Sequence, residues 1–165
     1  MTGEKTASLG RLILVLLLGG LATACSSVKY YPNTLEKNVL VKTTLDSGSV
    51  FNEAQAHFHV YSIDKQCNEV HLGAVKLDQP EVEVGIATGK PVVIEVAFGI
   101  GGNFFSSSSS VIRVETMLTP RTHYFYDVNA SYDDGIYDVE VFEKKKRKSR
   151  GRLLKTVPSS SCKPE

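Results

Sequence analysis

The chain has 165 residues, of which 42% are hydrophobic and 22% are charged. This balance is that of a globular protein and excludes an intrinsically disordered chain. The formal net charge is only +1, but residues 144–155 contain eight basic and no acidic residues. This uneven charge suggests a specific use for the basic segment.

The first segment, residues 1–24, has the features of an export signal. Lys5 and Arg11 are followed by the short apolar run 12–18 and then by small residues. A charged start, a short apolar run and small residues before a cleavage site define a secretory signal. The apolar stretch 12–24 has 13 residues, fewer than the roughly 18 to 20 that span a bilayer. We therefore expect residues 1–24 to be removed.

The residues around Cys25 indicate the kind of signal. Residues 21–25, LATAC, resemble the lipobox of bacterial lipoproteins, although Ala22 stands where that family more often has Leu. The resemblance implies that Cys25 is acylated and becomes the first residue of the mature chain, with stable membrane anchoring. Ser26 after the cysteine implies sorting to the outer membrane of a Gram-negative cell, on its periplasmic face. The alternative is an ordinary signal peptide with a chance cysteine.

The mature chain is expected to form a tether followed by one domain. Residues 25–37 are polar with one proline, which predicts a flexible lipidated tether. From residue 38 to residue 165, short runs alternate between apolar and polar residues, as strands do. The predicted strands are 38–45, 55–63, 69–77, 81–87, 91–98, 111–118, 123–130 and 136–143, with a short final strand at 153–157.

These strands predict an all-β fold. No window has helical periodicity, and seven or eight short, closely spaced strands are typical of an antiparallel β-sandwich, with a small barrel as the alternative. Turn residues at 46–49, 88–91 and 132–135 separate successive strands. Residues 87–128, with a Gly-Lys turn before an apolar strand, loosely resemble hairpins of small periplasmic β-sandwich lipoproteins, which implies the same fold.

Two cysteines remain once Cys25 is assigned to lipid. In an oxidising compartment, Cys67 and Cys162 are expected to pair. Their bridge would close a loop of about 95 residues and stabilise the fold by roughly 3 to 5 kcal/mol. The sequence has no CxxC pattern, which disfavours redox or zinc chemistry at these thiols.

The candidates for metal binding and catalysis are weak. His57 and His59 project to one side of a predicted strand, and His71 or His123 could add a third ligand. A solvent-facing polar strand explains them equally well, so we expect no metal. The acidic run near residue 134 favours a turn over a calcium site, and residues 106–110 lack the Gly-x-Ser-x-Gly motif of hydrolases. We expect no enzyme activity and no cofactor.

Two segments are candidates for binding. The Gly- and Ser-rich loop 99–110 carries Phe104 and Phe105, which either contact a partner or pack onto the core. The run KKKRKSRGR, residues 144–152, resists burial and is expected to form an exposed loop between the last two strands. Its predicted binding residues are Lys144, Lys145, Lys146, Arg147, Lys148, Arg150 and Arg152.

The basic run could meet lipid or glycan phosphates, an acidic protein or nucleic acid, or it could be merely solvated. Nucleic acid is disfavoured because the chain carries an export signal. The sequence thus predicts a lipid-anchored, non-enzymatic accessory or structural lipoprotein that binds another envelope component. The alternative is a module that recognises anionic lipid or glycan through residues 144–155. In either case, reversing Lys145, Arg147 and Arg150 to Glu is expected to abolish binding without disturbing the fold.

Overall fold

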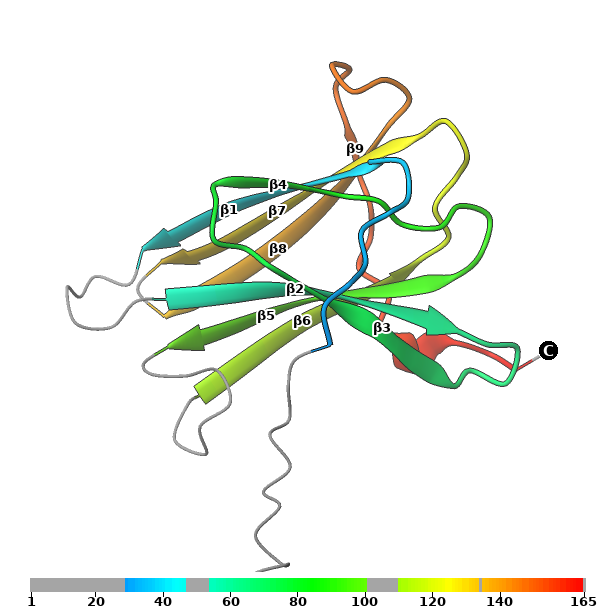
Figure 1. Cartoon of the computed structure of the whole chain (residues 1–165), viewed down its shortest axis with the longest axis horizontal. Helices are drawn as coiled ribbons and strands as arrows, with labels where there is room; N and C mark the ends of the chain where they lie inside the picture. Colours follow the sequence, from blue (N-terminus) through cyan, green and yellow to red (C-terminus); the bar gives the residue numbers. More distant parts are fainter. Residues whose placement is uncertain (1–28, 47–53, 101–109, 134, 165) are drawn as a thin grey trace, which may run out of the picture.

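The computed structural model describes residues 29–46, 54–100, 110–133 and 135–164 (Figure 1). This part of the chain contains nine strands in two sheets, one short 3-10 helix and no α-helix. The strands are β1 (Val39–Asp46), β2 (Ala54–Ile63), β3 (Glu69–Lys76), β4 (Glu81–Val84), β5 (Val92–Ile100), β6 (Ser110–Leu118), β7 (Phe125–Asp133), β8 (Ile136–Lys144) and β9 (Arg152–Leu153), and the helix is η1 (Ser159–Ser161). The prediction of an all-β sandwich is confirmed.

One sheet has the strand order β4-β1-β7-β8-β9 and the other has the order β3-β2-β5-β6. Every pair of described neighbouring strands is antiparallel except β1 and β7, which are parallel, with Val39 opposite Tyr126. A parallel pair requires a long connection between its strands. Here the connection contains β2 to β6. The first strand of the chain therefore lies between β4 and β7, in a sheet whose last three strands come at the end of the chain.

The alternating apolar residues of both sheets meet in one core. Phe58 of β2 and Val128 of β7 are fully buried, and Val41 of β1 lies with them. Each such side chain contributes about 1.5 to 3 kcal/mol when it leaves water. Tyr126 is also buried, and its hydroxyl accepts a hydrogen bond from the backbone N–H of Arg121 at 2.9 Å. A buried phenol needs such a partner.

The N-terminal segment, residues 29–38, lies on the sandwich. Tyr31 enters the core, and its N–H donates to the Ala74 carbonyl of β3 at 2.9 Å. The Ala74 N–H donates in turn to the Lys29 carbonyl at 2.8 Å. Gly73 makes this approach possible, because a Cβ there would lie 2.5 Å from the Tyr31 nitrogen. The segment therefore binds the edge of the four-stranded sheet.

The same segment also binds the edge of the other sheet. The Tyr31 hydroxyl donates to the Gly85 carbonyl at 2.8 Å, and the Gly85 N–H donates to Asn33 Oδ1 at 2.9 Å. A Cβ at Gly85 would lie 2.3 Å from the Leu35 carbonyl oxygen. Because these contacts use the backbone groups after Val84, β4 ends there rather than at the predicted residue 87.

These contacts change the expected domain boundary. Residues 29–37 were predicted to belong to the tether, but they are part of the packed domain because their backbone and side chains bond to both sheets. The predicted tether is thus reduced to residues 25–28, which lie outside the described residues together with the predicted signal.

The C-terminal segment, residues 154–163, crosses between the sheets on the opposite side. The predicted strand at 153–157 is limited to β9 because the chain leaves the five-stranded sheet after Leu154, whose N–H donates to Val141 at 2.8 Å. The Met117 N–H of β6 then donates to the Val157 carbonyl at 2.6 Å. The Ser159 N–H and hydroxyl donate to the Glu115 carboxylate at 3.1 and 2.8 Å.

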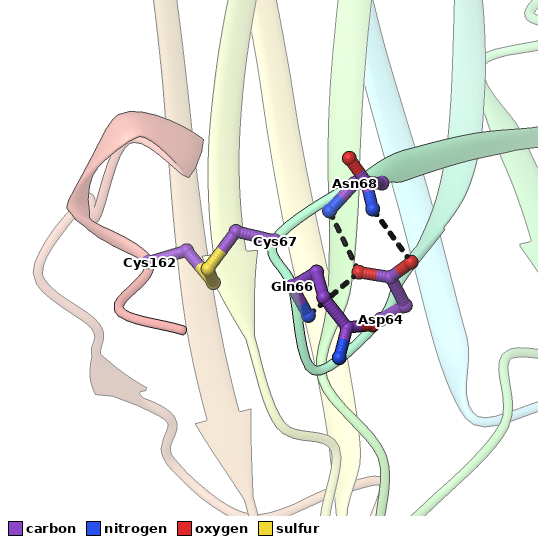
Figure 2. The surroundings of a disulfide bond; sticks show 5 residues. All are labelled: Asp64, Gln66, Cys67, Asn68 and Cys162. Carbon is purple, nitrogen blue, oxygen red and sulfur yellow. Dashed lines mark hydrogen bonds between the residues drawn. A yellow bond between two sulfur atoms is a disulfide. The ribbon is translucent and has the colours of Figure 1, made fainter. Parts of the chain in front are cut away.

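The segment ends in the predicted disulfide, which joins Cys162 to Cys67 with 5.8 Å between their Cα atoms (Figure 2). Cys67 lies in the turn between β2 and β3. The Asp64 carboxylate shapes this turn by accepting hydrogen bonds from the backbone N–H groups of Gln66 and Asn68, at 2.9 and 2.8 Å. The disulfide therefore joins the chain end to a well-ordered hairpin of the four-stranded sheet.

Candidate functional site

The basic run forms a loop between β8 and β9, as predicted. The basic loop, residues 145–151, projects beyond β9 in Figure 1, where it is orange. Ser149 shapes its turn, because its N–H and hydroxyl both donate to the Lys146 carbonyl, at 3.0 and 2.8 Å. The loop is thus an ordered feature of the surface.

Two cations at the base of the loop are bound by the domain's own acids. Lys144 is ion-paired with the Asp127 carboxylate. Arg152 donates to Glu143 Oε2 at 2.9 Å, and Arg121 binds the same carboxylate. Burial alone would raise the pKa of Glu143, but the hydrogen bonds from these two arginines keep it below its ordinary value. Asp127 and Glu143 thus bind Lys144 and Arg152 to the five-stranded sheet.

Arg147 has a structural role within the loop. Its guanidinium is ion-paired with the Glu83 carboxylate of β4 and donates to the Lys37 carbonyl at 2.7 Å. It also lies 5.1 Å from the centre of the Phe125 ring, within the range of a cation–π contact. Arg147 thereby binds the loop to the N-terminal segment and to the five-stranded sheet.

The remaining cations of the loop are exposed. Lys145, Lys146, Lys148 and Arg150 make no side-chain hydrogen bond or ion pair with another described residue. The seven predicted binding residues therefore divide into three that the fold uses and four that face solvent. The pattern of the sequence could not separate the two groups, because the partners of the first lie elsewhere in the chain.

A pocket of about 450 Å³ lies at the base of the loop, with Lys145 in its wall. The N-terminal segment forms another wall, where the Asn38 side chain bonds the backbone of Ile86 at both its N–H and its carbonyl, at 2.9 and 3.0 Å. The remaining wall comes from the connection between β6 and β7. The volume of the pocket is within the range of small-ligand sites.

The β6–β7 connection brings polar and aromatic groups to this pocket. Thr122, His123 and Tyr124 line it, and His123 has a positive φ of 63°. The Arg121 guanidinium covers one face of the Tyr124 ring at 3.9 Å from its centre. Lys145 and the acid Glu36 both line the pocket, so its charge is mixed. Its hydroxyl, imidazole and aromatic groups suit a hydroxylated ligand, and Lys145 could bind a negative group on it. Sequence analysis missed this pocket because its walls come from distant segments.

Of the histidines considered for metal binding, the structure pairs His59 with His71, 3.1 Å apart at Nδ1 and Nε2. Burial, together with the nearby His71, His57 and Arg113, lowers the pKa of His59 to about 4. His123 instead lines the pocket. Among the described residues, no group of three or more histidine, cysteine or acidic side chains is arranged to hold a metal ion.

Beside the histidines lies a buried acid that sequence analysis did not single out. Glu95 accepts hydrogen bonds from the Tyr61 hydroxyl at 3.4 Å and from Arg113 at 3.2 Å. Burial raises the pKa of Glu95, and burial with the nearby Glu95 raises the pKa of Tyr61 to about 12. The signal for this acid was its isolation in the apolar run 92–98.

Phe104 and Phe105, the other predicted binding residues, lie outside the described residues, as does Cys25. No helix in the described part of the chain is long and apolar enough to cross a membrane. Comparisons with protein-family models, with curated proteins and with solved structures gave no match.

Proposed function

We propose that this protein is a non-enzymatic accessory lipoprotein of the bacterial envelope, anchored through Cys25 to the periplasmic face of the outer membrane. Its domain binds an acidic envelope protein through the basic loop. The anchor rests on the LATAC sequence before Cys25. A disulfide between Cys67 and Cys162 suits an oxidising compartment.

The observation that carries the binding proposal is the set of four exposed cations that have no acidic partner among residues 29–46, 54–100, 110–133 and 135–164, on a loop shaped by Ser149. Like charges at this spacing repel, and an acidic surface relieves that repulsion. Because Arg147 and Ser149 fix the loop before binding, little conformational entropy is lost on association. A projecting, charged loop also increases the rate at which an acidic partner is found.

The structure changes the choice of variant that tests this proposal. Arg147→Glu would break the ion pair with Glu83 and disturb the loop. A loss of binding in that variant could then result from the altered structure rather than from the lost charge. The better triple variant is Lys146→Glu, Lys148→Glu and Arg150→Glu, since all three side chains are exposed and unpaired among the described residues. The matched control reverses three exposed lysines elsewhere on the domain, Lys76, Lys90 and Lys163.

The unaltered chain and both variants, as mature chains with Cys25→Ser, would be used as bait for detergent-solubilised bacterial envelopes without cross-linking. We expect the unaltered chain and the control to retain a stoichiometric acidic protein that high salt releases, because exposed charges are screened over about 10 Å at 0.1 M. The loop variant should lose it. Equal retention by the loop variant and the control would refute the proposal.

A second candidate function, recognition of an anionic glycan or lipid headgroup, is favoured by the pocket that Lys145 lines. The triple variant leaves Lys145 in the pocket wall unchanged, so the two functions can be tested separately. Lys145→Gln would weaken binding of lipopolysaccharide or anionic vesicles, whereas Lys148→Gln, outside the pocket, would leave it nearly unchanged. If neither substitution alters such binding, the glycan or lipid candidate fails and the protein partner remains.

A further inference from the structure

The short segment between Cys25 and the packed domain limits the distance between the domain and the proposed membrane anchor. Cys25 precedes Lys29 by four residues, and an extended chain spans at most about 14 Å over that length. A domain of this size is roughly 35 Å across. The Lys29 carbonyl is fixed to β3 by the Ala74 N–H at 2.8 Å. A lipid on Cys25 would therefore bring the membrane to the β3 side and leave the far side out of reach.

The direction of the chain narrows this surface further. Tyr30 pairs with Ala74 in a parallel bridge, so the chain reaches that bridge from the side on which β3 begins, at Glu69. Val70 is the next residue of that strand. The surface nearest the anchor thus includes Lys29, Tyr30 and the first residues of β3.

Of the four exposed residues of this surface, Lys29, Tyr30, Glu69 and Val70, all but the acid Glu69 suit a lipid interface. Tyr30 is 77% exposed although its neighbour Tyr31 is buried in the core, and Val70 is 54% exposed. Lys29 is also exposed, and its ammonium donates to the His71 carbonyl at 2.9 Å. Tyrosine is enriched at the membrane–water boundary, where its ring contacts acyl chains and its hydroxyl contacts water. Lysine beside it favours lipid phosphates.

We propose that the edge formed by Lys29, Tyr30 and the start of β3 is a membrane-contacting surface, with Tyr30 and Val70 in the phospholipid interface. The proposal rests on the lipidation of Cys25 proposed above. In Figure 1 the described chain begins beside β3, at its dark blue end, whereas the orange basic loop stands beyond β9. A domain seated on its β3 edge directs that loop away from the membrane and toward a partner.

The chain offers a direct test because it contains no tryptophan. A single tryptophan introduced by Tyr30→Trp or by Val70→Trp reports the surroundings of that position alone. The matched controls are Ile136→Trp and Leu153→Trp on the five-stranded sheet, whose native residues are 72% and 56% exposed. Each lipidated protein would be reconstituted into phosphatidylethanolamine–phosphatidylglycerol vesicles with plain or brominated acyl chains.

We expect brominated lipid to quench fluorescence at positions 30 and 70 by about half or more, and fluorescence at positions 136 and 153 by less than about a tenth, because quenching requires contact with the acyl chains. Circular dichroism would establish that each variant keeps its strands. Equal quenching at all four positions, or none at positions 30 and 70, would overturn the membrane-contacting surface.

Labelling with a radioactive fatty acid separates this proposal from the anchor itself. An acylated chain without quenching at positions 30 and 70 refutes the surface and leaves the anchor intact. A chain without label on Cys25 refutes both. If Tyr30→Trp disturbs the bridge to Ala74, Val70→Trp still decides the question, because Val70 pairs with Ser62 of β2 and is not one of the two residues that form the bridge.

Discussion

The Arg147 guanidinium is ion-paired with the Glu83 carboxylate, which lies 64 positions earlier in the chain. The ion pair fixes the basic loop against β4. The hydrogen bond from Arg147 to the Lys37 carbonyl also attaches the loop to the N-terminal segment. One cation of the loop therefore positions the others, which remain available to a partner.

Arg147→Ala should lower the free energy of unfolding by about 1 kcal/mol, because it removes a half-exposed ion pair, a hydrogen bond and a cation–π contact. Lys148→Ala, on the same loop, should change it by less than about 0.5 kcal/mol. Urea denaturation measures both. Equal values for the two variants would show that Arg147 does not hold the loop.

Removal of the disulfide by Cys67→Ala with Cys162→Ala should lower the free energy of unfolding by roughly 3 to 5 kcal/mol, because the bridge joins residues 95 positions apart. The native protein should contain no alkylatable thiol at these positions before reduction. In the variant, hydrogen exchange should accelerate in residues 157–163, which lose their covalent attachment. Unchanged exchange there would mean that the contacts with β6 suffice.

Gly85→Ala should displace the N-terminal segment, because the new Cβ would lie 2.3 Å from the Leu35 carbonyl oxygen. We expect a loss of about 1 to 3 kcal/mol, as for other overpacked sites, together with faster hydrogen exchange at the Tyr31 amide. Gly89→Ala is the control: its φ of +76° makes alanine costly, but no atom lies within 4 Å. Slow exchange at Tyr31 in Gly85→Ala would contradict the close packing.

Stability should fall as the pH is lowered from about 6.5 to about 4. The pKa of His59 is near 4 in the folded protein, so in this window the unfolded chain binds a proton that the folded one does not. The lowered pKa of His71 acts in the same direction, and the raised pKa of Glu95 acts against it. The net loss should be on the order of 1 kcal/mol after solvent screening.

Urea midpoints at pH 7 and pH 5 measure this dependence, and His59→Gln should flatten it, because glutamine keeps a polar side chain without the titration. A midpoint that does not move between these two values, in the unaltered protein, would rule out the proposed contribution of the histidine pair.

Local patterns were enough to predict the strands. The predicted strand 55–63 corresponds to β2 (Ala54–Ile63) and 111–118 corresponds to β6 (Ser110–Leu118). Alternation marks a strand because successive side chains point to opposite faces, a property that needs no distant residue. The turn before β8 was placed slightly too early, since β7 continues to Asp133.

The disulfide and the basic loop were also predictable, for reasons of composition. Only two cysteines remained after Cys25, so the choice of partner was fixed. Dense positive charge cannot be buried, so the run had to lie at the surface. The sequence could not show which cations of the run are paired and which are exposed, because this depends on where Asp127, Glu83 and Glu143 lie in the folded chain.

The class of fold, the strand positions, the cysteine pair and the exposed basic loop could all be predicted, because each of them follows from neighbouring residues or from simple counting. The parallel pairing of β1 with β7, the pocket beside Lys145 and the packing of residues 29–38 on both sheets became visible only in the folded chain. These features depend on backbone groups and charges that meet only after folding. Gly73 and Gly85, for example, matter because Tyr31 and Leu35 approach them from far along the chain.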